Sequence, residues 1–293
     1  MTNRKSVFSL ILCYILWGFQ PLYWSFIPNV HPYVLLACRI IMAAVFSCLI
    51  LLCKHRFAEL LCVFRSREIL KYLLPAVVFL AADWAVFLIV VNAGHVLDAS
   101  LGYYINPLVL FAFGVVIYKE KCTRIQLAAL AVAVIGVLIS TAAFGSFPYI
   151  SLIIAVNWAI YTVFKKKIQI DGVLSIAAET LILTPFAIAF LLLFRRADLA
   201  AMDVREILFM VGSGIITALP MFLFSNSVAA FPLIVMCFAQ YLSPTFNLLC
   251  GLLMGESFSR GQIVSFLFFI AAICLFTFGE IRQQRSRLKE AEK

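Results

Sequence analysis

The sequence predicts an all-α integral membrane protein with ten transmembrane helices arranged as two inverted five-helix repeats. Of its 293 residues, 65% are hydrophobic and only 13% are charged, a balance too apolar for a water-soluble domain. Ten apolar runs of roughly 18–22 residues are each long enough to cross a hydrocarbon core of about 30 Å. Motifs of the first half recur in the second half. Because five is odd, two such halves must insert with opposite orientations.

The expected spans follow the apolar runs in chain order. They are 6–26, 33–53, 70–91, 98–117, 126–143, 147–164, 173–194, 206–229, 232–253 and 262–280. The first run lacks a small-x-small cleavage site, so we interpret it as a retained span and not as a signal peptide. Pro75, Pro185 and Pro220 lie in the third, seventh and eighth runs and are kink candidates of lesser weight, because they have no matched partner in the other repeat. No connection is long enough to form a soluble catalytic domain.

The two repeats are defined by matched positions. These are Tyr104 to Pro107 with Tyr241 to Pro244, Gly114 with Gly251, Glu120 with Glu256, Trp17 with Trp158, and Arg39 with Glu179. The offsets lie between 136 and 141 positions, a drift that a few inserted or deleted loop residues would explain. We therefore expect a first repeat at 1–145, an inverted second repeat at 146–281, and a basic cytoplasmic tail at 282–293.

The basic residues predict the orientation. With the N-terminus inside, 18 Lys and Arg residues fall on the cytoplasmic side and 4 on the outer side, with Arg39 left within a span. Cytoplasmic loops of membrane proteins carry such an excess, so both termini are expected in the cytoplasm. The net charge of +9 is confined to short connections, which argues against nucleic acid as a partner; the lipid bilayer is the expected environment.

The sequence offers no cofactor or metal motif. Nine cysteines stand singly, without a CxxC pair, and we interpret them as small core residues. An intramembrane enzyme would need a nucleophile, a metal set or paired carboxylates at one depth, whereas the charges here lie in opposite thirds of the bilayer. We expect no enzyme activity, no cofactor and no metal site.

Two charges are expected at similar depth near the outer surface. Arg39 in the second span and Asp83 in the third both lie about 9–12 Å below it by helical rise. Intramembrane charges normally face the protein interior or a water-filled cavity. Either the two side chains form a structural ion pair, or Arg39 binds an anionic group of a cargo molecule and Asp83 orients it.

Glu179 is the repeat counterpart of Arg39 but is expected near the inner surface. It has no obvious cation unless Lys165 or Lys166 folds back from the end of the sixth span. A carboxylate without a cation in a low-dielectric site is a candidate for proton coupling. The alternative is a neutral, hydrogen-bonded structural glutamic acid.

His95 and Asp98 flank the start of the fourth span. Asp98 is well placed to cap that helix by accepting from its free amides. A proton relay through His95 and Asp98 is the alternative. One histidine and one carboxylate do not make a metal site.

The two matched prolines, Pro107 and Pro244, are expected to kink the fourth and ninth spans. Polar and aromatic side chains near them, and on the first and third spans, are expected to bind substrate together with Arg39 and Asp83. These are Trp17, Gln20, Trp84, Asn92, Tyr103, Tyr104, Asn106, Gln240, Tyr241 and Ser243. For Trp17, packing or anchoring at the interface is the alternative to stacking on cargo.

One segment is similar to a known family. The run from Asp98 to Pro107, followed by Gly114 and by Glu120 thirteen positions after the proline, resembles the RarD family of EamA-type transporters. So do the Trp17-Gly18 pair, Gly145-Ser146, the Lys165 to Ile168 run and Glu179-Thr180. The family belongs to the drug/metabolite transporter superfamily, and the resemblance covers essentially the whole chain.

The resemblance implies a bacterial inner-membrane carrier with a central cavity that exports or exchanges small organic molecules, and RarD-like proteins are named for a chloramphenicol-sensitivity phenotype. Two features depart from the pattern. Pro244 and Glu256 are twelve positions apart rather than thirteen, and Asp83 stands where RarD-like sequences carry a neutral amide. The cargo or the coupling ion is therefore expected to differ.

We predict a secondary active transporter that works by alternating access, with a small-molecule substrate and Glu179 as a candidate for carrying a coupling proton. A passive channel or scramblase-like conduit of the same fold is the alternative. A nucleotide-sugar carrier would be expected to show more cationic residues in the cavity than Arg39 alone. The sequence leaves open the cargo, the direction of flux, the coupling ion, and whether two copies form a homodimer.

Overall fold

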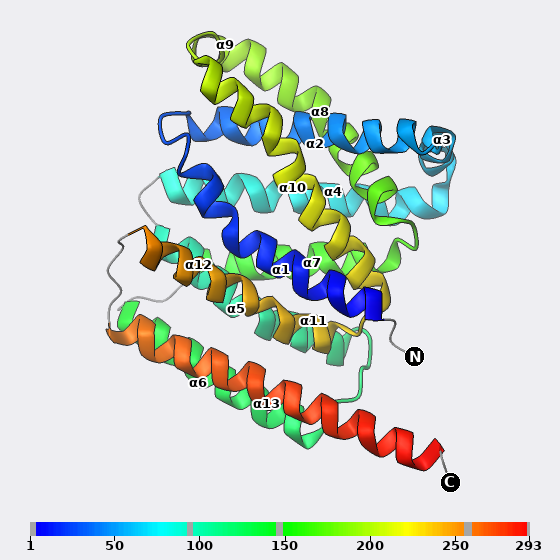
Figure 1. The fold of residues 1–293 in the computed structure, drawn as a ribbon, viewed down its shortest axis with the longest axis vertical. Helices are drawn as coiled ribbons and strands as arrows, with labels where there is room; N and C mark the ends of the chain where they lie inside the picture. The colour runs from blue at the N-terminus through cyan, green and yellow to red at the C-terminus, as the bar shows by residue number, and fades with distance from the viewer. Residues whose placement is uncertain (1–3, 93–95, 145–148, 255–259, 292–293) are drawn as a thin grey trace.

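The computed structural model describes residues 4–92, 96–144, 149–254 and 260–291. Over these residues the chain folds into helices joined by short connections, without a β-strand (Figure 1). The helices are α1 Arg4–Trp24, α2 Pro32–Cys53, α3 Phe57–Arg65, α4 Arg67–Asn92, α5 Val96–Val116, α6 Arg124–Phe144, α7 Tyr149–Lys167, α8 Gly172–Phe194, α9 Arg196–Ala200, α10 Val204–Ala230, α11 Leu233–Gln240, α12 Leu242–Leu253 and α13 Arg260–Ala291.

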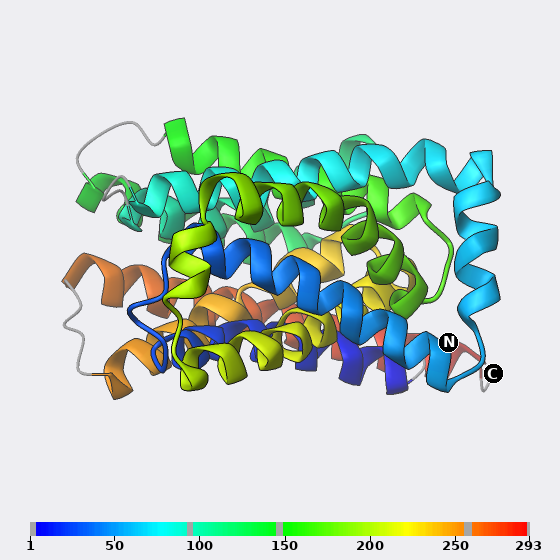
Figure 2. The same cartoon turned by 90° about the horizontal axis from the view of Figure 1, so that it is seen from above.

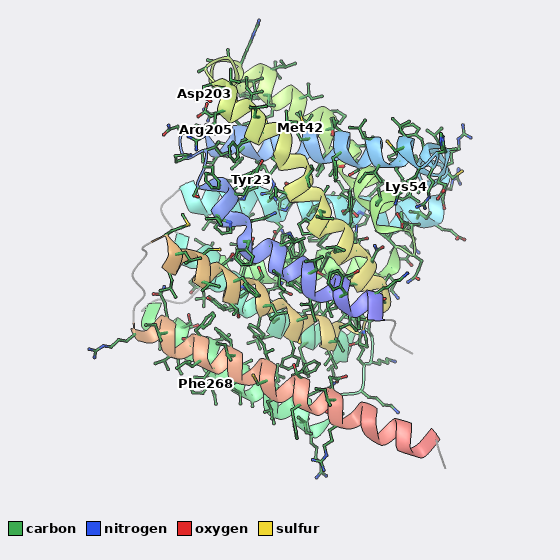
Figure 3. All side chains as sticks on the ribbon, viewed as in Figure 1. Tyr23, Met42, Lys54, Asp203, Arg205 and Phe268 are labelled. Carbon is green, nitrogen blue, oxygen red and sulfur yellow. The ribbon has the colours of Figure 1, made fainter. Side chains whose placement is uncertain are left out.

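The long helices form a bundle in which α1 begins and α13 ends on the same side (Figures 1 and 2). We call this side the Arg4 end, and the side where α1 ends and α2 begins the Pro32 end. Lys54 lies at the Arg4 end, and Asp203 and Arg205 lie at the opposite side (Figure 3). Apolar side chains cover the flanks between, as in a protein that faces lipid; Phe186, for example, is 71% exposed.

The predicted spans match helices of the structure closely in position. Among the described residues, eight helical segments are long and apolar enough to cross a membrane, and Leu101–Val116 of α5 is a shorter apolar helix. The helix α7 is not among the eight; it has 19 residues and ends in three lysines. The protein is therefore an all-α, multi-pass membrane protein, and the count of ten spans stays a prediction.

The two helices with matched prolines differ. The ninth predicted span is divided into α11 and α12 at Tyr241, and Pro244 lies in the first turn of α12. A proline fits there because the first amides of a helix have no partner within it. By contrast, α5 continues through Pro107 without a break, so the predicted kink of that helix stays a prediction.

Two short helices, α3 and α9, were not expected from the sequence. Helix α3 buries Leu60 and Val63, and it packs against α4 and α8 at the Arg4 end. Arg56 donates to Glu59 across its first turn at 2.7 Å. These helices are too short to span a membrane, so they add to the ends of the bundle and not to its crossing segments.

The packing of α1 brings its aromatic face to the centre of the bundle. Helix α1 contacts α10 and α12, while α5 and α4 pack on α7, and α6 pairs with α13 at one edge (Figure 1). Gly18 permits the approach to α12, because a Cβ atom there would come within 2.9 Å of the Ser243 carbonyl oxygen. The neighbouring Trp17 is thereby held at the interface of the two halves.

Candidate functional site

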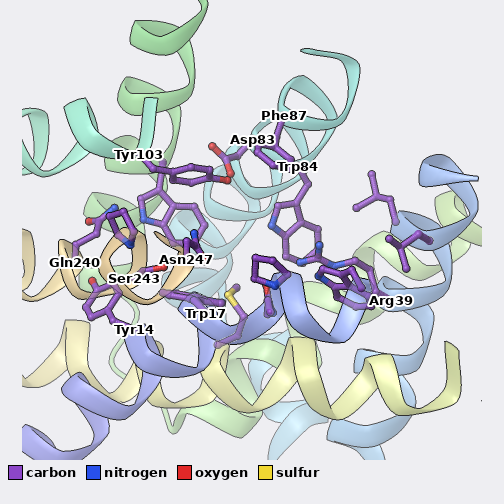
Figure 4. Close-up of a pocket in the computed structure, with 18 of the residues that line it drawn as sticks. Tyr14, Trp17, Arg39, Asp83, Trp84, Phe87, Tyr103, Gln240, Ser243 and Asn247 are labelled. Atoms are coloured by element: carbon purple, nitrogen blue, oxygen red, sulfur yellow. The ribbon is translucent and has the colours of Figure 1, made fainter. Parts of the chain in front are cut away.

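A cavity of about 280 Å³ lies among α1, α2, α4, α5, α7, α10 and the α11–α12 pair (Figure 4). Its lining begins at Tyr14, in the middle of α1, and extends to Trp24 and Pro32, where α1 ends and α2 begins. At about 1.5 Å per residue, Tyr14 and Trp24 are some 15 Å apart along the helix. The cavity therefore occupies the half of the bundle nearer the Pro32 end.

Seven of the 19 residues that line the cavity are aromatic. The rings that line it are Tyr14, Trp17, Trp24, Trp84, Phe87, Tyr103 and Trp158. Trp17 and Trp158, which the sequence matched as repeat counterparts, meet edge to face with ring centroids 5.6 Å apart. Such a wall suits the apolar body of a small organic molecule.

The polar groups of the wall come from five helices. They are Gln20, Arg39, Asp83, Gln240, Ser243 and Asn247. Gln20 donates through Nε2 to the Ile216 carbonyl oxygen at 2.9 Å, and Gln240 donates through Nε2 to Asn106 Oδ1 at 2.6 Å. One N–H donor of each amide is thus bonded within the protein.

Arg39 lies against two tryptophans. Its guanidinium carbon is 4.8 Å from the ring centroid of Trp84 and 5.8 Å from that of Trp24. Stacking on an aromatic face leaves the N–H edge of a guanidinium free to donate, and Arg39 Nε has no hydrogen-bond partner in the protein. The group can therefore take an anion from the cavity.

Asp83 is 1% exposed, and its Oδ1 atom is also without a hydrogen-bond partner. The structural ion pair with Arg39, one of the two alternatives left open by the sequence, is not formed: the structure describes both side chains, and no salt bridge joins them. Figure 4 shows the reason, since Trp84 lies between the two and Asp83 turns toward Tyr103. Equal depth along two helices was not sufficient to bring these charges together.

Of the remaining predicted residues, Trp17, Gln20, Trp84, Tyr103, Gln240, Ser243 and Pro244 line the cavity. Asn106 lies behind the wall, where its Nδ2 donates to the Ala155 carbonyl oxygen. Tyr104 and Tyr241 are not among the lining residues either. Both stack on Phe269 of α13, with ring centroids 4.8 and 4.9 Å apart. Consecutive helical residues point about 100° apart, so Tyr103 and Tyr104 do not share a face.

The side chains of Asn92 and Asp98, and all of His95, lie outside the described residues. The prediction of a substrate contact at Asn92 and of a cap or relay at His95 and Asp98 stays as it was. Within the described part of the chain, no group of three His, Cys, Asp or Glu side chains could hold a metal ion.

Glu179 is fully buried but does not line the cavity. It forms an ion pair with Lys165, whose Nζ also donates to Ser175 Oγ at 2.7 Å. Its other oxygen accepts from the Tyr161 hydroxyl at 3.0 Å. The expectation of a carboxylate without a cation is therefore wrong, and the alternative that Lys165 folds back onto Glu179 is correct. The short turn from α7 into α8 places the two side chains face to face.

Comparison with known proteins identifies the family to which the chain belongs. The sequence model of the EamA-like transporter family matches residues 4–142 and again residues 147–278. The chain belongs to this family. It is thus a transporter of the multi-pass inner-membrane type, and its predicted resemblance to RarD is confirmed by relatives that cover nearly the whole chain.

Three similar proteins illustrate the relationship of this EamA-type transporter. An uncharacterized transporter of Bacillus subtilis, YojE, is 35% identical over 97% of both chains. Protein RarD of Escherichia coli is 29% identical over 98% of both. A solved crystal structure superposes with a TM-score of 0.72 at 15% identity, covering 95% of this chain and 99% of the other, which shows that the fold is shared.

The Arg4 end of this transporter holds a set of polar contacts that sequence reasoning did not assign. Glu120 accepts through both carboxylate oxygens from the first amides of α11, at 2.8 Å from Leu233 N and 2.9 Å from Ile234 N. Gly114 makes room for it, because a Cβ atom there would lie 2.9 Å from Glu120 Oε2. The sequence had singled out Gly114 and Glu120 as positions matched between the two repeats. The structure shows that Glu120 caps the start of α11.

Two further hydrogen bonds lie at the Arg4 end of the bundle. Lys166 donates to the carbonyl oxygen of Phe231, beyond the end of α10. Tyr118 donates to the Val163 carbonyl oxygen at 2.9 Å, and burial raises the pKa of Tyr118 to about 12, so its hydroxyl remains protonated at physiological pH. Together with the pair of Lys165 and Glu179, the contacts of Glu120, Lys166 and Tyr118 connect α7, α8, α10, α11 and the segment after α5 at the Arg4 end.

Several cavity residues were missed by the sequence reasoning. Tyr14 and Trp24 lie three residues before and seven after Trp17, and Phe87 lies three after Trp84. This spacing places them on the same helical face as residues that were singled out. Extending each predicted site residue along its own face would have found them.

Proposed function

We propose that this chain is a secondary active transporter that exports a small amphipathic organic molecule by alternating access, with the cavity as its binding site. The observation that carries the proposal is a contrast along the bundle. The cavity reaches from Tyr14 toward the Pro32 end, whereas polar contacts join four helices and the segment after α5 at the Arg4 end. A carrier whose site is accessible from one side has this arrangement.

The size and lining of the cavity favour a small metabolite or drug as the cargo. A volume of about 280 Å³ lies near the lower limit of ligand pockets. Its aromatic rings and amides would hold the apolar and polar parts of such a molecule. With Arg39 as its cationic lining residue in the described chain, the cavity is poorly suited to a nucleotide sugar.

Rocking of the two repeats, 1–145 against 146–281, would expose the cavity to either side in turn. Three observations support this part of the proposal. The family model matches the chain once in each half, the matched Trp17 and Trp158 are in contact, and the Tyr241 hydroxyl donates to the Tyr104 carbonyl oxygen at 3.3 Å. Matched residues meet in this way near an axis that relates two repeats.

We further propose that the Arg4 end faces the cytoplasm, with the basic tail 282–293 on that side. The excess of Lys and Arg near this end supports the orientation. Proton coupling and a homodimer stay predictions. The carboxylate expected to carry the proton, Glu179, is already paired with Lys165.

Counterflow in proteoliposomes tests the proposal. The probes are labelled chloramphenicol, chosen because one relative, of Pseudomonas aeruginosa, is named a chloramphenicol-sensitive protein RarD, and labelled L-phenylalanine, a small amphipathic molecule. A carrier gives saturable uptake of label driven by unlabelled compound inside. Uptake that rises linearly with concentration and shows no counterflow would indicate a passive conduit. No uptake of either probe above empty liposomes would count against transport of this cargo class.

A further inference from the structure

A second hollow lies on a flank of the bundle, where α4 and α7 pack side by side (Figure 2). It is a groove of about 360 Å³ whose lining residues are Phe79 of α4 and Leu152, Ile153, Val156, Asn157 and Ile160 of α7. We call it the α4–α7 groove. Ile153 is 56% exposed, so the groove is open to the surrounding bilayer. It shares no lining residue with the central cavity.

The shape of the α4–α7 groove is fixed by two contacts between its helices. Asn157 donates through Nδ2 to the Phe79 carbonyl oxygen at 3.1 Å. The Phe79 ring stacks on Phe164 with ring centroids 5.9 Å apart. Apart from Asn157, the lining side chains are apolar. A fixed apolar groove that is open to lipid fits a hydrocarbon chain by van der Waals contact.

Two lysines lie where these helices reach the Arg4 end. Lys71 precedes Phe79 by eight residues, and Lys167 follows Ile160 by seven, so both lie about 10–12 Å from the groove along their helices. Seven residues are close to two helical turns, which places Lys167 on the same face of α7 as Ile160. Both lysines are exposed. Neither forms a salt bridge with a carboxylate of the described chain.

Two tyrosines accompany the lysines. The Lys167 ammonium lies 4.9 Å from the ring centroid of Tyr118, and the Lys71 ammonium lies 5.6 Å from that of Tyr72. Tyrosine and lysine are typical of the boundary between the hydrocarbon core and the lipid headgroups. Glu68, in the first turn of α4, offsets only one of the positive charges that α4 and α7 carry at this end. The lysines therefore favour an anionic headgroup.

The distance between the lysines and the groove suits one lipid molecule. An acyl chain crosses half of a hydrocarbon core of about 30 Å, and the groove begins about 10 Å from Lys167 along α7. A free anion would contact the lysines and leave the groove unused. A lipid without net charge would fill the groove and leave the positive charge of the lysines uncompensated.

We propose that the α4–α7 groove binds one phospholipid with an anionic headgroup. Its phosphate accepts from Lys71 and Lys167, and one of its acyl chains lies in the groove. Because α4 belongs to the first predicted repeat and α7 to the second, the bound lipid lies across the boundary between the two repeats.

A lipid titration of the unaltered chain tests the proposal. The purified full-length protein is delipidated in detergent and titrated with phosphatidylglycerol or with phosphatidylcholine of identical acyl chains, and bound lipid is counted by native mass spectrometry. Each lysine near an anionic headgroup is expected to contribute about fivefold to affinity, so the first phosphatidylglycerol should bind roughly 30-fold more tightly than the first phosphatidylcholine. Equal affinity of the two lipids overturns the proposal.

Three variants then separate the headgroup, the chain and the total charge. Lys71→Gln with Lys167→Gln should remove the preference for phosphatidylglycerol and spare the binding of phosphatidylcholine. Val156→Trp fills the groove and should weaken the first binding of both lipids. The matched control, Lys54→Gln with Arg124→Gln, removes two exposed cations that lie beyond α2 and at the start of α6. It should keep the full preference.

Each variant can contradict the proposal. A preference that survives in Lys71→Gln with Lys167→Gln, or that is lost equally in the control, would show that lipid binding follows total charge and not this site. Unchanged binding of both lipids in Val156→Trp would show that the acyl chain does not lie in the groove. Displacement of phosphatidylglycerol by excess inorganic phosphate would show that the lysines bind a free anion and not a lipid.

Discussion

The two ends of the bundle use buried charge differently. At the Arg4 end, Lys165, Glu179 and Glu120 each have a partner within the protein. In the cavity nearer the Pro32 end, Arg39 and Asp83 present atoms without one. Paired groups in a low-dielectric interior fix the positions of the helices that carry them. Groups without partners there are available to a ligand, so the difference separates residues that hold the fold from residues that bind cargo.

The largest effect on stability is expected from breaking the pair at the Arg4 end. Glu179→Ala leaves the Lys165 ammonium buried without its carboxylate, and loss of one partner of such a pair costs about 3–5 kcal/mol. The unfolding temperature in detergent should fall strongly. The double variant Lys165→Met, Glu179→Leu removes both charges and should recover much of the loss. A single variant as stable as the wild type would show that the pair does not hold the fold.

Arg39→Ala should instead have its largest effect on transport. Because Arg39 has no ion pair to lose, the folded protein should form in normal yield with a small change in unfolding temperature. Counterflow of L-phenylalanine, the counterflow probe that carries a carboxylate, should fall at least about tenfold, the effect of a lost charge-assisted hydrogen bond. Loss of folded protein would show that Arg39 holds the fold. Buried charge would then serve the same purpose at both ends of the bundle.

A smaller effect is expected from Glu120→Gln. An amide can keep one of the two hydrogen bonds to the start of α11 and loses the negative charge at that helix terminus, a change of roughly 1–3 kcal/mol. Cys237 lies one turn into α11 and is buried. If the cap also holds the Arg4 end closed, Cys237 should react faster with a membrane-permeant maleimide in Glu120→Gln than in the protein that retains Glu120. This is measured in a variant that retains Cys237 alone.

The corresponding control retains Cys13 alone, a buried thiol on α1. Its reactivity should not respond to Glu120→Gln. Equal acceleration at both cysteines would indicate general loosening and not an opening confined to α11.

The smallest effect is expected at the surface pair of Arg56 and Glu59. Arg56 directly precedes α3, and Glu59 lies in its first turn. The hydrogen bond from Arg56 lowers the pKa of Glu59 below its usual value of 4.5. A carboxylate with a lowered pKa adds stability above the unfolded-state pKa, and this is lost as the pH falls through the folded-state value. Because exposed pairs contribute little, this added stability is small, and Glu59→Gln should lower the unfolding temperature at neutral pH only slightly. A large drop would show that α3 braces the bundle.

Much of this contrast could be predicted from the sequence, and the rest depended on side-chain geometry. The apolar runs predicted the helix positions, and charge at membrane depth singled out Arg39, Asp83 and Glu179. Helical rise gives depth but not direction, so the sequence could not show that Trp84 would separate Arg39 from Asp83. The pairing of Lys165 with Glu179 depends on how the turn between α7 and α8 folds, and it remained an alternative.

The cavity lining was only partly predicted for a related reason. Tyr103 and Tyr104 were both expected to face the substrate, although adjacent residues of a helix point in different directions. The structure places Tyr103 in the cavity and Tyr104 on Phe269. Choosing one helical face, and following it from Trp17 to Trp24, would have given a better prediction than choosing neighbours in the chain.

The most direct test is the unfolding temperature of the double variant Arg39→Gln, Asp83→Asn, measured with and without L-phenylalanine beside the wild type. If the cavity side chains serve cargo and not the fold, the variant without ligand unfolds close to the wild-type temperature or above it. L-phenylalanine, which we expect to raise the unfolding temperature of the wild type, then no longer raises that of the variant. A variant that unfolds far below the wild type, or that L-phenylalanine still stabilises to the same extent, would contradict the account.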